Sequence, residues 1–324
     1  MQNKKITSSI FSFVGIIIAI AAVKYCVNYY TKEKLPNIRY ERRISALRKA
    51  KTDEERRSIY NKLSPTVDEE LEEIIERVLV KHQKESHLER GFVATMDARD
   101  GLIRSMVSLG ENGNISRISP SQPNIISGLK YSLGECFYIA AVTILAGNAD
   151  KGSIQDLHQI LCSGNRQLLD STILAYSNHD GATRLDVQMS DLLGEQLVFD
   201  SATSGDLSET SPNNMLQFCS ALFDKEGKQH SLRIFETQPD EEVNQRISPL
   251  PELIWNDVIE KTEWRQSAEA GKYSTIIRFD KSLGWVLIAV EYVEPTFGGA
   301  QLILQDLKTS NRHKLQQLRS VKPH

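Results

Sequence analysis

The stretch Gly128-Leu129-Lys130-Tyr131-Ser132-Leu133-Gly134-Glu135-Cys136-Phe137-Tyr138-Ile139-Ala140-Ala141-Val142 is the most informative part of the 324-residue chain. A cysteine follows a glycine-containing turn and opens a helix of aromatic and small residues. A helix N-terminus stabilises negative charge, so it favours the nucleophilic thiolate. Free amides of the first turn can also bind an oxyanion. The pattern predicts a central helix that begins at a catalytic Cys136. An inert core cysteine is the alternative, because free cysteine is among the most buried residue types.

Three pairs within this stretch resemble the cysteine box of ubiquitin-specific proteases: Gly128-Leu129, Leu133-Gly134 and Cys136-Phe137. That family belongs to the papain-like cysteine peptidase superfamily. The resemblance implies a papain-like domain with a central helix and an antiparallel sheet. It also implies a deubiquitinase-like thiol hydrolase that acts on a peptide or isopeptide bond, with a protein substrate such as a ubiquitin conjugate.

The resemblance further implies a histidine base after the cysteine, followed by an acid or amide that orients the imidazole. His230, in the run Gln229-His230-Ser231, is the candidate base, and Asp240 or Asn244 is the candidate orienting residue. The chain departs from the family at this point, because the family's histidine box expects Gly-His-Tyr. It also lacks the paired CxxC zinc ribbon of the family.

Cysteine spacing and net charge exclude several classes of site. The four cysteines are Cys26, Cys136, Cys162 and Cys219, and no two form a CxxC pair. Zinc and thioredoxin-like sites have close cysteine spacing, so we expect neither a metal nor a cofactor. The formal net charge of -3 argues against a nucleic-acid partner, which usually requires a strongly basic face.

An uncharged run at residues 6–23, ITSSIFSFVGIIIAIAAV, predicts a single-pass transmembrane helix, with residues 1–30 as the anchor and the lipid bilayer as a partner. A cleaved signal peptide is the alternative, because small residues near 19–22 could form a cleavage site. Lysine and arginine are frequent after the run. The positive-inside rule therefore predicts that the C-terminal part lies in the cytosol.

Residues 31–91 are predicted to form a helical stalk. Thr52 and Glu55 have the spacing of a capping box, and so do Thr66 and Glu69. Apolar residues then recur at helical spacing and predict an amphipathic helix. These residues are Val67, Leu71, Ile74, Ile75, Val78 and Leu79.

Residues 92–307 are predicted to form a soluble α+β domain, followed by a basic tail at 308–324. We expect the central helix at 129–145, further helices to about residue 194, and strands only after that point. Two hairpins are predicted, 217–223 with 231–236 and 273–279 with 285–293, because turn residues separate each pair of apolar runs. A last strand is predicted at 301–305. Helices would therefore come first and an antiparallel sheet second.

The sequence thus supports two hypotheses about function. One is a membrane-anchored cysteine hydrolase that uses Cys136, His230 and either Asp240 or Asn244. The other is a non-catalytic, membrane-anchored protein-interaction module. The distance between the Cys136 sulfur and the His230 ring separates the two hypotheses, because a working base must lie within hydrogen-bond reach of its nucleophile.

Overall fold

The computed structural model describes residues 20–97, 101–122, 126, 130–132, 140–145, 209–223, 229–239, 273–280, 283–294 and 299–320, with isolated positions between 156 and 193. The chain divides into two compact units. Unit 1 comprises Met1–Pro65 and Glu236–Pro239, and unit 2 comprises Thr66–Phe235 and Asp240–His324. Each unit is considered by itself.

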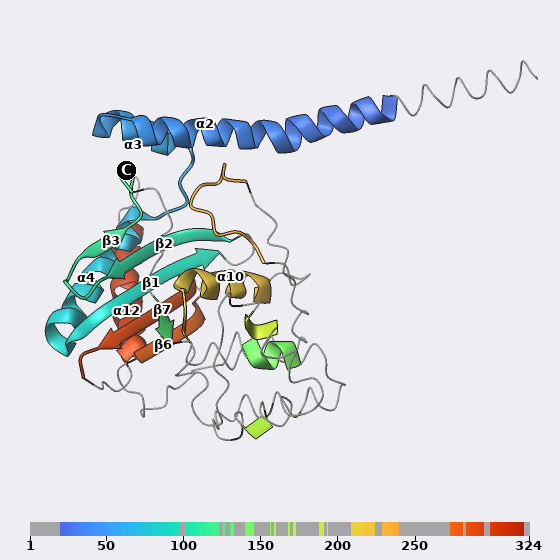
Figure 1. Ribbon diagram of the computed structural model, residues 1–324. Helices are drawn as coiled ribbons and strands as arrows, with labels where there is room; N and C mark the ends of the chain where they lie inside the picture. Colours follow the sequence, from blue (N-terminus) through green and yellow to red (C-terminus); the bar gives the residue numbers. More distant parts are fainter. Residues whose placement is uncertain are drawn as a thin grey trace, which may run out of the picture. The chain divides into compact units, whose positions relative to one another are not determined.

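Unit 1 is helical from residue 20 to residue 49 and contains a π-helical turn. The turn η1 (Tyr30–Lys34) leads directly into α2 (Leu35–Lys49), and α3 (Asp53–Lys62) follows (Figure 1). Pro36 lies in the first turn of α2. Proline has no N–H to donate back along the helix, and a local widening of the helix accommodates that loss. The proline therefore explains why the regular hydrogen-bond pattern changes at this point.

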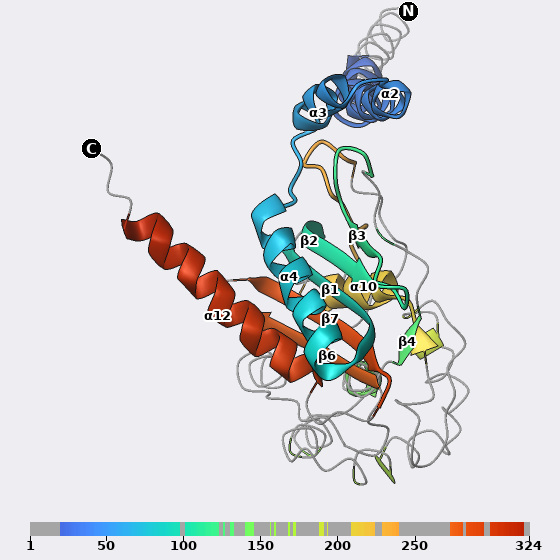
Figure 2. The ribbon, with the colours of Figure 1, turned by 90° about the vertical axis from the view of Figure 1, so that its left-hand side faces the viewer.

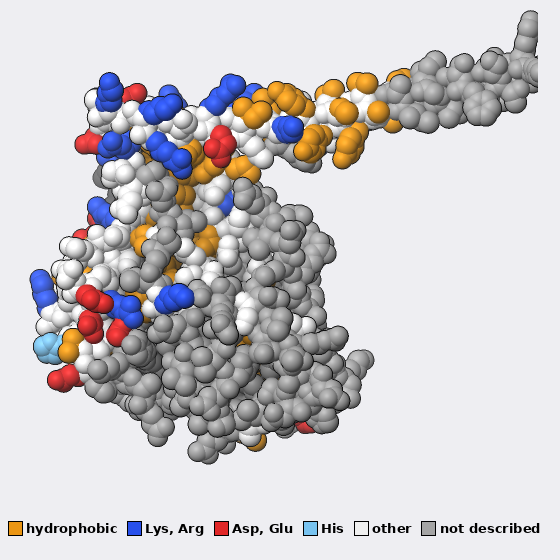
Figure 3. Space-filling view, viewed as in Figure 1, with side chains coloured by type: hydrophobic (Ala, Val, Ile, Leu, Met, Phe, Trp, Pro, Cys, Tyr) orange, Lys and Arg blue, Asp and Glu red, His pale blue; other side chains and the backbone are white. Residues whose placement is uncertain are grey.

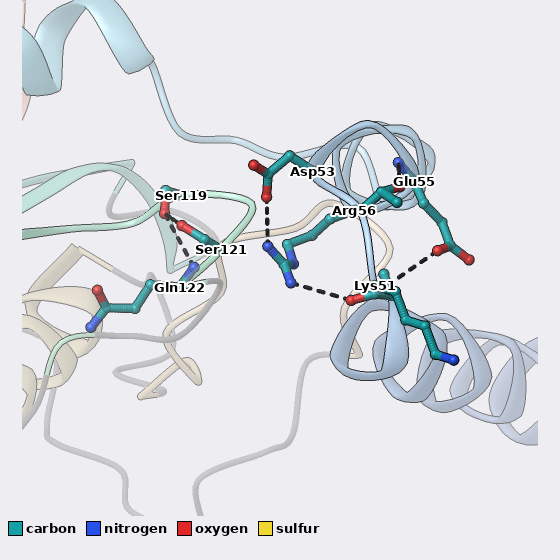
Figure 4. Close-up of polar contacts among 9 residues, drawn as sticks. Lys51, Asp53, Glu55, Arg56, Ser119, Ser121 and Gln122 are labelled. Carbon is teal, nitrogen blue, oxygen red and sulfur yellow. Dashed lines mark hydrogen bonds and ion pairs between the residues drawn. The ribbon is translucent and has the colours of Figure 1, made fainter.

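The predicted capping box at the start of α3 is confirmed. The Thr52 hydroxyl accepts a hydrogen bond from the Glu55 amide at 3.2 Å, and the Glu55 carboxylate accepts one from the Lys51 amide at 3.2 Å (Figure 4). These bonds satisfy amides that a helix N-terminus leaves without partners.

The second predicted capping box is displaced by two residues. α4 (Glu69–Ser86) is capped by Asp68, whose carboxylate accepts a hydrogen bond from the Leu71 amide at 3.0 Å. The Thr66 hydroxyl instead donates to the Ile103 carbonyl at 2.6 Å. Thr66 therefore contacts Ile103 and does not cap α4.

Unit 2 is built on a five-stranded antiparallel sheet in the order β3-β2-β1-β7-β6 (Figure 1). The strands are β1 (Leu88–Asp97), β2 (Leu102–Leu109), β3 (Ile115–Arg117), β6 (Tyr273–Asp280) and β7 (Gly284–Tyr292). β1 lies in the centre, where Val93 is opposite Val107 on one side and opposite Ile288 on the other. The sheet therefore joins strands from the two ends of the unit.

Helices cover both faces of this sheet. α4 and α12 (Gly299–Ser320) lie against each other and pack on one face, as Figure 2 shows. α10 (Pro212–Phe223) contacts β7 from the other side. Val93, Val286 and Ile288 are among the fully buried strand residues of the core under α4 and α12. Because both faces are covered, β1 and β7 are buried along almost their whole length.

A charged cluster joins the two helices on the first face. The Asp306 carboxylate of α12 is 2.9 Å from the Lys81 ammonium and 3.1 Å from His82 Nε2, both on α4. Partial burial acts to raise the pKa of Asp306. The hydrogen bonds and charges of Lys81 and His82 outweigh this effect and hold the pKa below its usual value. The ionised carboxylate therefore links α12 to α4.

The structure corrects the predicted order of helices and strands. Residues 217–223 are part of helix α10 and residues 301–305 are part of helix α12, so both predicted strands are wrong. The hairpin at 273–293 is confirmed as β6 and β7. β1, β2 and β3 were not predicted, so the statement that helices come first and the sheet second is also wrong. Short apolar runs do not distinguish a buried helix from a buried strand.

The predicted transmembrane helix is not supported either. Over the residues that the structure describes, no helix has an apolar run long enough to cross a bilayer. The described helix from residue 20 onward carries Lys24, Lys32 and Lys34. Residues 1–19, which hold most of the predicted anchor, lie outside the described residues. The predicted location in the cell therefore stays a prediction.

The buried Glu72 carboxyl group of α4 contacts the backbone next to the paired residues of β2 and β3. Glu72 is 1% exposed, and its Oε1 accepts a hydrogen bond from the Met106 amide at 3.1 Å. Burial raises the pKa of Glu72 to about 8, although the amides of Met106 and Ile118 and the charge of Arg117 act in the opposite direction. The folded protein therefore holds a proton that an unfolded chain would release near pH 4.5.

We expect Glu72 to make unfolding depend on pH. Between about pH 4.5 and pH 8 the folded state keeps this proton and the unfolded state loses it. The free energy of unfolding should therefore fall as pH rises through this interval, by at most about 1.4 kcal/mol per pH unit. Urea titrations from pH 4.5 to 8.5 should show this slope in the wild type and not in Glu72→Gln. Glu73→Gln, at an exposed neighbour, should keep it. Parallel profiles for the wild type and Glu72→Gln would contradict the assignment.

We also expect that replacing Gly101, in the turn between β1 and β2, lowers the stability of the protein. Its φ is +67°, and a Cβ there would lie 2.6 Å from the Ser231 carbonyl oxygen. Gly101→Ala should lower the free energy of unfolding by at least about 1 kcal/mol, because both the backbone angle and the contact become strained. Gly110→Ala is the matched control, since its Cβ would meet nothing closer than 3.8 Å. Equal melting temperatures for the two variants would show that the strain is absent.

Candidate functional site

Of the quoted stretch, residues 130–132 lie beside the sheet and residues 140–142 are helical. β4 (Tyr131–Ser132) pairs with β5 (Glu209–Thr210) and contacts β6 and β7. Lys130 is exposed and comes directly before β4, in chain that is neither helix nor strand. β6 is an edge strand of the five-stranded sheet. The surface around Lys130, β4 and the β6 edge is therefore the candidate functional site.

Tyr131 anchors this surface to the sheet through Arg90 and Glu291. Its side chain is 1% exposed, and the Arg90 guanidinium lies 5.2 Å from the centre of its ring. Arg90 on β1 also forms an ion pair with Glu291, its cross-strand neighbour on β7. Burial raises the pKa of Tyr131 well above its usual value, while the charge of Arg90 opposes this and that of Glu291 adds to it. The phenol therefore stays neutral and has a structural role.

Hydroxyl groups near β5 also make structural contacts. Thr210 donates a hydrogen bond to the Leu193 carbonyl at 2.8 Å and lies 3.2 Å from the Asn214 side-chain amide, which donates to it. Ser211 accepts from the Asn214 amide at 3.2 Å and so caps α10, with Pro212 as the first helical residue. A capping serine followed by proline is a signature of a helix start, and it would have predicted α10.

The structure places only one of the predicted catalytic residues. His230 is half-buried, and its backbone amide donates to the Ser220 hydroxyl at 3.0 Å. Cys136, Asp240 and Asn244 lie outside the described residues. Their proximity to His230 therefore stays a prediction. Over the described ranges, no group of three His, Cys, Asp or Glu side chains could hold a metal ion.

Comparison with known proteins found similar structures but no related sequence. No family model matches the sequence, and no curated protein matches it. Penicillin-binding protein 2B from Streptococcus pneumoniae is similar in structure, with a TM-score of 0.50 and 10% identity over 77% of this chain and 59% of that chain. A peptidoglycan glycosyltransferase from Burkholderia ambifaria has a TM-score of 0.47 and 13% identity over 81% of this chain and 99% of that chain. The chain shares the fold of penicillin-binding protein 2B. At this identity the likeness concerns the fold alone.

This fold overturns the papain-like prediction. The resemblance to ubiquitin-specific proteases is wrong, and with it the assignment as a thiol hydrolase with a ubiquitin-linked substrate. The membrane-anchored interaction module and the lipid partner are not supported either. The error has a simple physical cause. A glycine turn before a helix of small residues suits any tightly packed core helix, so a motif confined to residues 128–142 could not decide the fold.

One sequence pattern next to the candidate site is not among the predictions above. Penicillin-binding proteins carry the signatures S-x-x-K, S-D-N and K-T-G, in which the first serine is the nucleophile. This sequence holds one S-x-x-K, from Ser127 to Lys130, and neither S-D-N nor K-T-G. A looser Ser-x-Asn occurs at 163–165 and 211–213.

The backbone at Lys130 does not suit the chemistry of that signature. A spacing of three residues brings two side chains onto one face only when both lie on a helix. Lys130 is not helical and leads into the extended strand β4. Ser127 lies outside the described residues. The described geometry therefore gives no helical support for a serine–lysine pair at this place.

We expect the buried hydroxyl of Tyr131 to lower stability. It has no hydrogen-bond partner among the described residues, and a buried polar group without a partner costs about 1–3 kcal/mol. Tyr131→Phe should therefore leave the free energy of unfolding unchanged or raise it by up to about that amount. Thr66→Val, which removes a buried hydroxyl that donates to the Ile103 carbonyl at 2.6 Å, should lower it. Thermal and urea unfolding measure both variants. A clear loss of stability in Tyr131→Phe would contradict the assignment.

Proposed function

We propose that this chain is a penicillin-binding-protein-like domain that binds peptidoglycan-related material and does not catalyse acyl transfer. The fold supports the first half of the proposal, because penicillin-binding protein 2B has the same architecture. The residues support the second half, since function depends on the site and not on the fold.

One observation carries the proposal: the signatures of the acyl-transfer site are incomplete. K-T-G and S-D-N are missing from the whole sequence. The hydroxyls of Thr210 and Ser211, beside the candidate site, are engaged in backbone contacts. Tyr131 stays neutral and buried. These groups provide a scaffold rather than a nucleophile with its base.

The alternative is an acyl transferase that uses Ser127 as nucleophile and Lys130 as base. The observation that favours it is the single S-x-x-K, whose lysine lies directly before a strand that contacts β6 and β7. In this mechanism the Ser127 oxygen bonds to the carbonyl carbon of an amide, Lys130 accepts the hydroxyl proton and passes it to the departing nitrogen, and the carbon–nitrogen bond breaks.

A fluorescent penicillin separates the two functions, because its ring opens onto an active serine and leaves a stable acyl adduct. We expect intact-mass spectra of the full chain to show no adduct, and Ser127→Ala and Lys130→Ala to behave as the wild type does. A penicillin adduct that disappears in both variants would establish the acyl transferase instead. Gln122→Ala, at an exposed site nearby in the sequence, is the control.

Binding is tested by co-sedimentation with purified, protein-free peptidoglycan. We expect the full chain to sediment with it at physiological salt and Lys130→Glu to sediment less, because Lys130 is the exposed cation of the candidate site. Lys84→Glu changes charge equally at an exposed position on α4 and should bind as the wild type does. Failure of the wild type to sediment would contradict the binding function.

A further inference from the structure

One glutamate of α4 points into the protein, while its neighbours on the helix face solvent. Glu72 is 1% exposed, whereas Glu69, Glu70 and Glu73 are exposed. Figure 3 shows acidic (red) and basic (blue) side chains on the surface of unit 2, over the region that α4 and β3 occupy in Figure 1. Burying a carboxyl group is costly unless it is hydrogen-bonded or uncharged. The interior position of Glu72 therefore depends on the groups around it.

The groups that bind Glu72 lie at the end of the ladder between β2 and β3. The last paired residues of this ladder are Val107 and Arg117. The next residue on each strand, Met106 or Ile118, directs its backbone amide to the Glu72 carboxyl group, and the Met106 amide is 3.1 Å from Oε1. Glu72 therefore takes the place of a further cross-strand pair and joins the end of β3 to α4.

β3 is held more weakly than α4. It consists of three residues, all half-buried, and it is the outer strand of the sheet, paired only with β2 among the described strands. α4 instead buries Leu71, Ile75 and Leu79 and contacts β1, β2 and α12. Regions with few buried contacts open first. Water therefore reaches Glu72 by separation of β3 from β2, while α4 stays in place.

The paired state favours the uncharged form of Glu72. Burial raises its pKa to about 8 and the charge of Glu69 adds to this, while the two amides and the charge of Arg117 oppose it. Arg117 does not neutralise Glu72, because its side chain is 42% exposed and its guanidinium lies 3.6 Å from Glu76 and 4.0 Å from Glu73. When β3 separates, water hydrates the carboxyl group and returns its pKa toward the ordinary value of 4.5. The paired state therefore binds the proton more tightly than the open state does.

We propose that separation of β3 from β2 releases the proton of Glu72, so that pH sets how often this edge of the sheet opens. Below about pH 4.5 both states keep the proton, and opening does not depend on pH. Between about pH 4.5 and pH 8 each opening releases one proton, and the equilibrium constant for opening rises about tenfold per pH unit. Above about pH 8 both states have lost the proton, and the dependence ends. β3 is thus held at low pH and released as pH rises.

Met106 links this edge of the sheet to the candidate site. Its amide binds Glu72, and its sulfur accepts a hydrogen bond from the Ile126 amide at 3.2 Å. Ile126 comes shortly before Lys130, the exposed cation of the candidate site. Opening of β3 therefore takes place next to a contact that supports the chain leading into that site. The proposal itself does not depend on the proposed function.

Hydrogen exchange of single amides in the full chain, measured by NMR between pH 6 and pH 8, tests this coupling. Because intrinsic exchange also depends on pH, the measured quantity is the protection factor, the ratio of the intrinsic rate to the observed rate. In the wild type we expect the protection of the Met106 and Ile118 amides to fall about a hundredfold over this interval. Glu72→Gln keeps the shape of the side chain but has no proton to release, so protection should stay constant within about threefold. Glu73→Gln removes a charge from an exposed position and should behave as the wild type does.

The amide of Val93 separates opening of the edge from unfolding of the whole unit. Val93 lies on the central strand β1, so its amide should be at least about tenfold better protected than those of Met106 and Ile118. Equal protection of the three amides would show that only complete unfolding exposes Glu72, and it would overturn the proposal. So would constant protection of Met106 and Ile118 in the wild type, or the same hundredfold fall in Glu72→Gln. If Glu72→Gln does not fold, the three amides of the wild type still decide between these outcomes.

Discussion

The ladder between β1 and β7 is the constraint on which unit 2 depends. Each strand is almost fully buried, so every backbone amide in it needs a partner within the protein. Their antiparallel pairing provides part of these partners, and β2 and β6 provide the rest. The pairing also fixes which side chains face each helix layer. β2 and β3 then extend the sheet from β1, and β6 extends it from β7. The helices α4 and α12, which adjoin these two strands in the chain, contact each other.

Local sequence patterns predicted an element correctly only where turn residues or a capping pair marked it. The turn at Asp280–Gly284 separates two apolar runs, and β6 and β7 form the hairpin that it predicts. Thr52 and Glu55 likewise cap α3 as their spacing indicates. The central strand β1 was missed because Phe92, Val93 and Ala94 are all buried, which removes the alternation that marks a strand with one exposed face. Residues 217–223 were predicted as a strand because a short apolar run does not distinguish a buried strand from a buried helix such as α10.

The candidate site was harder to predict, because distant parts of the sequence assemble it. Tyr131 depends on Arg90 and Glu291, which lie in the two central strands. No spacing within residues 128–142 reveals these neighbours. The Ser-x-x-Lys pattern at 127–130 lies a few residues before Cys136, on which the prediction of the site rested. A helix N-terminus stabilises a thiolate in many folds, so this effect does not identify the fold of the chain.

The wide separation of β1 and β7 has a consequence for how the protein is made. The ribosome releases the β1–β2 hairpin long before it releases β7. The side of β1 that pairs with β7 is therefore unpaired during much of synthesis. Closing such a long loop makes folding slow compared with hairpin formation. An unpaired apolar strand edge also invites pairing with other chains. Nascent chains of this protein therefore have a particular need for chaperones, and shortened products that end before β7 should be the forms that aggregate.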